Sequence, residues 1–277
     1  MNKVSAFADE ISQNVTEQIS VLKRNGVHNI ELRSVWDKKV LELTIDEIKQ
    51  VKQQVQDAGM GFSAVGSPLG KFPLSGNIQE QLDATRKALE IAKVLEAPYI
   101  RMFSFHIPKG DDPAQHRAQV IDWLSAMIKE AEQTEIILAH ENENGIYGDT
   151  GERCLDLYET LKSPNFTGIF DFANFVQAGE SPYTDCWQKL KPYITYFHIK
   201  DARLEDGNVV PPGQGDGDME KILTEAYADG FDNFLTLEPH LYRPKLNPDT
   251  TKIESFETAA SALKAILSRI PQAAQSL

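Results

Sequence analysis

Eight short apolar segments, separated by helix-like segments, are the feature that most constrains the fold of this chain. They span residues 4–8, 28–33, 61–67, 99–105, 135–142, 167–174, 194–202 and 233–240. Mostly continuous apolar runs of this length are typical of strands in a parallel sheet that is covered by helices. The helix-like segments between them supply the crossover connections that parallel strands require. The sequence therefore predicts an α/β protein.

Helix start and stop signals support this alternation. Asn14 and Thr44 are candidate N-caps, each followed three positions later by a glutamate, and Gly26 and Gly59 end the two segments. An apolar face with helical spacing starts at Ile78 and repeats to residue 92. Helices are predicted over 15–25, 45–58, 78–92 and 252–269. A further helix is predicted after residue 218, with Asp218 as a candidate cap.

Eight strand-plus-helix units in 277 residues fit a closed (β/α)8 barrel, and we expect one domain over residues 1–277. A doubly wound open sheet is the competing α/β fold. It commonly has a glycine-rich first turn, and the first turn here contains no glycine. The irregular stretches 203–216 and 241–250 follow the seventh and eighth strands, so both belong to the expected active-site rim. The first contains a glycine cluster that we interpret as a flexible rim loop.

Four polar residues lie near the ends of the last four predicted strands, one on each. They are Glu141, Asp171, His198 and Glu238. In a (β/α)8 barrel the C-terminal strand ends converge on the active site. Three carboxylates would repel one another there, and a divalent cation would hold them ionised. The sequence therefore predicts one divalent metal ion, and carboxylates with one imidazole suit Mn, Mg, Co or Zn.

Cationic and neighbouring polar residues also fall near strand ends, and we expect them to contact the substrate. They are Arg33, Lys71, Arg101, His106, Lys200, Arg203 and His240. Gathered at one mouth, these side chains would hold a phosphate or carboxylate group. Asn174 would either reach a sugar hydroxyl or cap a helix.

Composition limits the other classes of function. The net charge of −13 disfavours binding to nucleic-acid phosphates. No apolar stretch approaches the length of a membrane span, and the first residues do not form a signal peptide. Two cysteines do not make a disulfide framework. We therefore expect a cytoplasmic protein without a membrane or nucleic-acid partner, and homo-oligomerisation is compatible with the composition.

Several motifs together resemble the xylose-isomerase-like TIM-barrel superfamily, and within it the sugar phosphate isomerase/epimerase family. They are the H-x-K-D of His198, Lys200 and Asp201, the E-N of Glu141 and Asn142, the D-x-x-N of Asp171 and Asn174, and the L-E-P around Glu238. The resemblance covers nearly the whole chain. It implies the same barrel, a small sugar or sugar-like substrate, and metal-dependent chemistry in carbohydrate metabolism.

In ketose 3-epimerases of this superfamily, two Glu, one Asp and one His bind a single metal. By position these match Glu141, Asp171, His198 and Glu238. The resemblance implies that Glu141 and Glu238 also exchange the substrate proton. Such epimerases often have His where this chain has Asn174, and their substrate-binding Arg is matched only approximately by Arg203.

Three functions follow as hypotheses. The first is a metal-dependent isomerase or epimerase of a small sugar, sugar phosphate or related hydroxy-carbonyl compound, in which Glu-mediated proton transfer passes through an enediolate. The second is a dehydratase of a keto-polyol such as an inosose. The third is a non-catalytic sugar-binding barrel. We find no second set of metal ligands in the sequence, which favours proton transfer over a metal-assisted hydride shift.

Overall fold

The eight predicted strands form a closed parallel barrel. The computed structural model describes residues 3–245 and 248–274. The strand order around the ring is β1-β12-β9-β8-β7-β6-β5-β2, and β1 pairs with both β12 and β2. The strands are β1 (Lys3–Ala6), β2 (Asn29–Leu32), β5 (Gly61–Val65), β6 (Tyr99–Met102), β7 (Ile137–Glu141), β8 (Phe166–Asp171), β9 (Ile194–Ile199) and β12 (Phe234–Leu237). This closure confirms the (β/α)8 barrel and excludes an open sheet.

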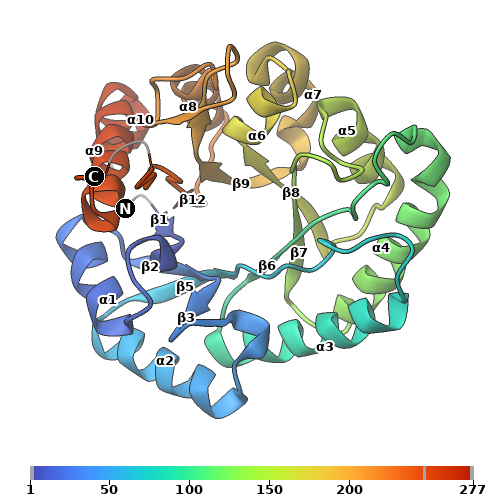
Figure 1. Ribbon diagram of the computed structural model, residues 1–277, viewed down its shortest axis with the longest axis horizontal. Helices are drawn as coiled ribbons and strands as arrows, with labels where there is room; N and C mark the ends of the chain where they lie inside the picture. The colour runs from blue at the N-terminus through green and yellow to red at the C-terminus, as the bar shows by residue number, and fades with distance from the viewer. Residues whose placement is uncertain (1–2, 246–247, 275–277) are drawn as a thin grey trace.

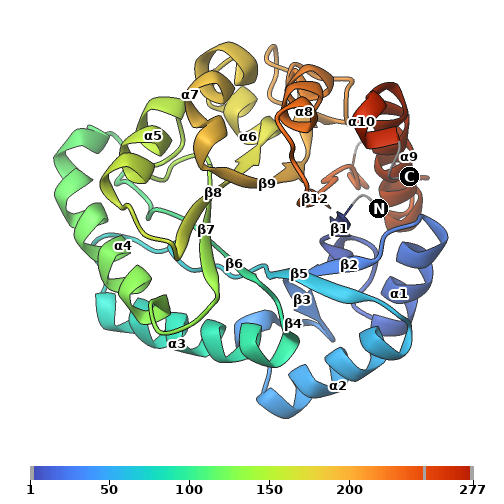
Figure 2. The same cartoon turned by 180° about the vertical axis from the view of Figure 1, so that it is seen from behind.

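Helices surround the barrel, as Figures 1 and 2 show from opposite sides. The main helices are α1 (Val15–Arg24), α2 (Ile45–Asp57), α3 (Ile78–Leu95), α4 (Arg117–Ala131), α5 (Gly151–Thr160), α6 (Phe172–Gln177), α7 (Gln188–Leu190), α8 (Met219–Ala228), α9 (Lys252–Arg269) and α10 (Pro271–Ala274). Short helical turns are η1 (Ala8–Glu10), η2 (Val40–Glu42), η3 (Pro113–His116), η4 (Pro182–Trp187) and η5 (Lys191–Tyr193). No helix in these described ranges is long and apolar enough to cross a membrane.

Side-chain caps fix where several helices begin. The side chain of Asn14 accepts a hydrogen bond from the backbone N–H of Glu17, at 3.1 Å, and so starts α1. Thr44 and Thr251 form capping boxes at α2 and α9. The predicted cap at Asp218 is wrong, because its side chain makes no capping hydrogen bond and its φ is +51°.

Apolar side chains fill two separate parts of the fold. The larger core lies between the helices and the outer face of the barrel. The smaller one, which includes Tyr99, Ala139, Ile169 and Tyr196, lies inside the barrel. Side chains alternate between the two faces of a strand, so the next inward position lies two residues further along. On β6, β7, β8 and β9, polar residues of the site occupy this next position. The apolar interior therefore forms the floor of a polar upper layer.

Two small hairpins interrupt the repeating pattern. One joins β3 (Ser34–Val35) to β4 (Lys38–Lys39), and the other joins β10 (Asp201–Ala202) to β11 (Val209–Val210). The second lies partly in the stretch 203–216 that was predicted to be irregular. The buried carboxylate of Asp201 accepts hydrogen bonds from the backbone N–H groups of Gly213, Gly215 and Gly217, at 2.8 to 3.0 Å. The glycine-rich loop is thus organised around one side chain. Of the other irregular stretch, residues 246 and 247 lie outside the described residues.

Candidate metal centre

The four predicted ligands come together at the C-terminal ends of β7, β8, β9 and β12. One donor atom from each of Glu141, Asp171, His198 and Glu238 lies within 4.8 Å of the others, and all four residues are buried. The strand register explains this, because His198 pairs with Asp171 on β8 and with Thr236 on β12. Glu141 pairs with Ile169, two residues before Asp171, and Glu238 lies two residues after Thr236. Offsets of two residues keep all four side chains on the same face of the barrel wall.

The contacts within this cluster suit a cation-binding site. The Nδ1 atom of His198 lies 2.9 Å from Oε1 of Glu141 and 4.0 Å from Oε2 of Glu238. Among the described residues, His198 Nδ1 and Asp171 Oδ2 are buried polar atoms without a hydrogen bond of good geometry. Buried polar atoms usually have such a partner. Oxygen and imidazole donors at this spacing fit a divalent ion.

Two asparagines hold the strand ends in place. The side chain of Asn142 accepts a hydrogen bond from the N–H of Asp171 at 2.9 Å and donates one to its carbonyl oxygen at 3.0 Å. The amide of Asn174 donates to the carbonyl oxygen of Asn142 at 2.8 Å and to Oε1 of Glu141 at 3.4 Å. Asp171, and not Asn174, caps α6. Asn174 therefore supports Glu141 directly, whereas the sequence indicated a sugar contact or a cap.

Three of the predicted cations reach the cluster, and each is ion-paired there. Lys200 Nζ lies 2.9 Å from Asp171 Oδ2 and 3.2 Å from Glu238 Oε2. Arg101 Nη1 lies 3.3 Å from Glu141 Oε2 and 3.8 Å from Glu238 Oε1. Arg33 contacts Glu238 Oε1 at 2.7 Å and also pairs with two acidic side chains of η1. These cations are already engaged by carboxylates of the protein.

The remaining predicted residues lie at the rim or outside the cluster. Lys71 pairs with Glu143 at 2.7 Å and stacks on the ring of Phe103. His106 and Arg203 are exposed, and no hydrogen bond or ion pair of the cluster within the described chain includes either side chain. Neither side chain contacts the four proposed ligands, and their contact with a substrate stays a prediction.

His240 belongs to a second group of potential ligands that the sequence did not indicate. Its Nε2 atom is 3.2 Å from Oε1 of Glu10 and 3.5 Å from Oε1 of Glu238, and the three residues together are spaced as metal ligands could be. Arg33 already contacts both of these carboxylate oxygens, at 3.4 and 2.7 Å. The permanent charge of Arg33 therefore already offsets part of the negative charge of this group.

Negative charge exceeds positive charge in and around the cluster. Six carboxyl groups face three Arg or Lys side chains and the imidazole of His198: Asp9, Glu10, Glu31, Glu141, Asp171 and Glu238 against Arg33, Arg101, Lys200 and His198. Burial, together with the charges of Glu141 and Glu238, outweighs the opposing charge of Lys200 and raises the pKa of Asp171 to about 7. Burial also raises the pKa of Glu10 to about 7. A bound divalent ion would offset most of this excess and favour the ionised carboxylates.

Glu141 is held ionised in spite of its burial. Burial raises its pKa, but the charges of His198 and Arg101 outweigh that effect, and the pKa falls to about 2. The pKa of Glu238 is likewise well below its usual value, because Lys200, His240 and Arg33 overcome the effect of burial. Both groups are therefore available as proton acceptors near neutral pH.

Sequence reasoning missed Glu31, which is completely buried inside the barrel. Its Oε2 atom lies 3.2 Å from Nε2 of His198, and the hydroxyl of Tyr196 donates to its Oε1 atom at 3.4 Å. The available signal was a lone acidic residue within the apolar segment 28–33.

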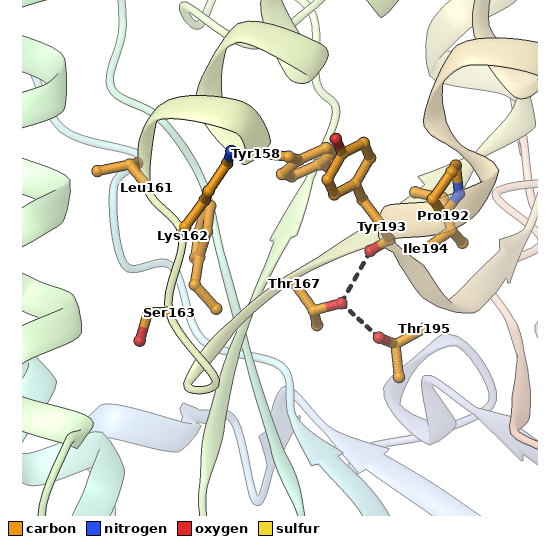
Figure 3. A pocket seen from close by; sticks show the side chains of 10 residues that line it. Tyr158, Leu161, Lys162, Ser163, Thr167, Pro192, Tyr193, Ile194 and Thr195 are labelled. Carbon is orange, nitrogen blue, oxygen red and sulfur yellow. Dashed lines mark hydrogen bonds between the residues drawn. The ribbon is translucent and has the colours of Figure 1, made fainter.

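A separate hollow lies at the opposite ends of β8 and β9. It has a volume of about 290 Å³, and Thr167, Thr195, Tyr158 and Tyr193 are among its lining residues, as Figure 3 shows. Thr167 and Thr195 begin these strands and hydrogen-bond to each other, whereas Asp171 and His198 lie near the other ends. This hollow is therefore not part of the candidate metal centre.

Comparison with known proteins agrees with this architecture. The family model described as xylose isomerase-like TIM barrel matches residues 19–266. The chain belongs to this family. The resemblance noted in the sequence is thus confirmed. No curated protein sequence matches the chain.

Several solved structures share this fold at low sequence identity. The IOLI protein with a binding zinc atom has a TM-score of 0.76 and 19% identity, with 97% of this chain and 99% of that chain covered. The D-allulose 3-epimerase from Methylomonas sp. in complex with D-allulose has a TM-score of 0.71 and 16% identity, with 97% of each chain covered. The probable 3-DHS dehydratase AsbF from Bacillus anthracis has a TM-score of 0.75 and 18% identity, with 95% of this chain and 99% of that chain covered. The shared barrel thus accompanies different named activities.

Proposed function

We propose that this member of the xylose isomerase-like family is a divalent-metal-dependent isomerase or epimerase of a small sugar or related hydroxy-carbonyl compound. Glu141, Asp171, His198 and Glu238 would hold the ion, and their spacing and burial support this assignment. When bound, such an ion polarises a carbonyl oxygen and so makes the neighbouring C–H group more acidic. The protein's own carboxylates then move the proton.

The arrangement of the two glutamates is the observation that carries this proposal. Each has one oxygen nearer His198 and the other nearer Arg101. The two oxygens of Glu141 lie 2.9 Å from Nδ1 of His198 and 3.3 Å from Nη1 of Arg101. The two oxygens of Glu238 lie 4.0 Å and 3.8 Å from the same two atoms. One oxygen can therefore serve as a ligand while the other faces a substrate. The glutamates lie on β7 and β12, three positions apart around the ring, and so can approach a substrate carbon from different sides.

Proton transfer would run between these two side chains. One ionised glutamate removes the proton from the carbon beside the carbonyl group. The other takes up a proton from water once substrate is bound and delivers it to the opposite face of the intermediate enediolate, and the first glutamate then releases its proton to water. Arg101 lies within 3.8 Å of both glutamates and would stabilise the negative charge that develops on the substrate. Lys200, paired with Asp171 and Glu238, would hold these two carboxylates in position.

We further propose that the substrate is uncharged. The sequence led us to expect an anion at the cationic mouth, but Arg33, Arg101 and Lys200 are each paired with carboxylates of the protein. A phosphate would have to break these pairs and enter a region with excess negative charge, which costs binding free energy. Mixed donors and acceptors at this site suit the hydroxyl groups of a neutral polyhydroxy ketone or aldose.

Turnover in deuterated water tests the chemistry. Neutral ketoses and aldoses, their phosphates and cyclic keto-polyols should be screened with added Mn²⁺, and the neutral compounds should have the higher kcat/KM. Proton transfer predicts solvent deuterium on the reacting carbon. Retention of the substrate hydrogen at every conversion would instead support a hydride shift, and loss of water, seen as a change in product mass, would identify a dehydratase.

Charge-removing variants test the two glutamates. Glu141→Gln and Glu238→Gln should each lower kcat by about 10²-fold or more, the lower range for a positioned acid or base. Glu143→Gln is the matched control, because it removes a carboxylate at the rim that pairs with Lys71. Metal content must be measured in all three proteins. Equal activity in parent and both glutamate variants, with metal bound, would reject the assignment.

A further inference from the structure

Glu31 is a buried carboxylate that the proposed proton transfer does not use. Both Glu31 and His198 have completely buried side chains, and they meet across the barrel interior from β2 and β9 at 3.2 Å. Removing a carboxylate from water is costly unless hydrogen bonds compensate. The contacts to His198 and to the Tyr196 hydroxyl provide that compensation. An apolar side chain would fill this position at lower cost, so the carboxylate calls for a specific role.

The hydrogen-bonding rules of the two groups define that role. An ionised carboxylate only accepts hydrogen bonds, so Nε2 of His198 must carry the hydrogen in the contact with Glu31. In a neutral imidazole the other nitrogen, Nδ1, then presents a lone pair. This Nδ1 atom is the one that lies 2.9 Å from Glu141 and has no hydrogen bond of good geometry among the described side chains. Glu31 thus favours the tautomer whose lone pair points into the carboxylate cluster.

Aromatic contacts fix the imidazole plane but not its tautomer. The ring of Phe7 packs edge-on against His198 with a centroid distance of 5.1 Å, and the ring of Tyr196 does so at 5.6 Å. Neither ring distinguishes a protonated Nδ1 from a protonated Nε2. Of the two carboxylates beside the ring, Glu31 holds the hydrogen on Nε2, whereas Glu141 lies beside Nδ1, where a bound cation would take the place of a hydrogen.

We propose that Glu31 is a positioning residue that orients His198 and sets its tautomer so that Nδ1 can bind a divalent cation. The inference rests on the proposed metal centre and adds to it a residue outside the ligand set. Carboxylates that hold a metal-binding histidine in this way typically change metal affinity 10- to 100-fold when they are replaced.

Zinc titration of Glu31→Gln tests the proposal. Zn²⁺ is added to metal-free protein at fixed pH, and affinity is measured by competition with a chelator. Glu31→Gln should bind Zn²⁺ about 10- to 100-fold more weakly than the parent, whereas the control Glu143→Gln should bind as the parent does. Binding of Glu31→Gln within about threefold of the parent, with an unchanged circular dichroism spectrum, would overturn the role of Glu31.

A second measurement uses the parent protein and does not depend on any variant folding. Two-bond ¹H–¹⁵N spectra of zinc-loaded protein should show His198 protonated at Nε2 and bound to the metal through Nδ1. Protonation at Nδ1 would overturn the proposal. If the parent binds no zinc, the proposed metal centre fails. The role of Glu31 then fails with it, because a ring oriented for metal binding has no such function without the metal.

Discussion

Replacing Asn142 by alanine should damage both the stability of the barrel and its affinity for metal. The side chain is fully buried and makes two hydrogen bonds to the main chain of Asp171. Its removal leaves one N–H and one C=O group unpaired, and at about 1–3 kcal/mol for each group the loss is about 2–6 kcal/mol. For a chain of this size, at about 2 °C for each kcal/mol, the expected decrease in Tm is about 4–12 °C.

Asn165 provides the matched comparison for this prediction. Its amide also joins the segments of β7 and β8, donating to the carbonyl oxygens of Thr134 and Ile136 at 3.1 and 2.8 Å. These bonds lie where the strands begin, far from their ligand-bearing ends. Asn165→Ala should therefore lower Tm but leave metal affinity unchanged, whereas Asn142→Ala should weaken Zn²⁺ binding by about tenfold or more. Calorimetry and chelator competition measure the two effects. Equal loss of affinity in both variants, or a stability loss below about 1 kcal/mol in Asn142→Ala, would refute this reasoning.

Three further predictions concern the metal and the loops. A saturating divalent ion should stabilise the fold by about 2.7 kcal/mol at 100 times its Kd, seen as a rise in Tm that a chelator reverses; an unchanged Tm would count against the metal centre. Gly215→Ala should accelerate hydrogen exchange in the segment 213–217, because the new Cβ atom would lie 2.4 Å from a carboxylate oxygen of Asp201; exchange at the parent rate would contradict the close approach. Thr251→Ala should cost about 1 kcal/mol through loss of the α9 capping box, and an unchanged urea midpoint would argue against that cap.

The barrel could be predicted from sequence because every strand carries its own apolar signal. The ends of the strands were less well predicted, and tertiary contacts explain why. The segment 99–105 was expected to be extended throughout, but β6 ends at Met102, and Phe105 adopts a φ of +65°. The N–H of Phe103 bonds to the carbonyl oxygen of Leu69 in the connection after β5. A local pattern cannot indicate a partner that lies more than 30 residues away.

The candidate ligands were predictable for the same reason as the strands. Glu141, Asp171, His198 and Glu238 each stand out as a polar residue near the end of an apolar segment, and a barrel brings such ends together. Glu31 was not predictable, because its significance depends on a residue on another strand. The pairing state of Arg101 was equally hidden, since a single cation in a sequence does not reveal which carboxylates surround it.

The closure of the ring between β1 and β12 has a consequence for how the protein acquires its site. The proposed ligands lie on strands that are consecutive in the ring, so they can assemble from the second half of the chain. Arg33 reaches Glu238 across more than 200 residues of sequence only when the first and last strands have joined. Contacts of such separation form slowly, because a long loop must close before they add any stability. Refolding experiments should therefore detect the carboxylate cluster before Arg33 pairs with it, and a divalent ion present during refolding would bind a partly closed barrel.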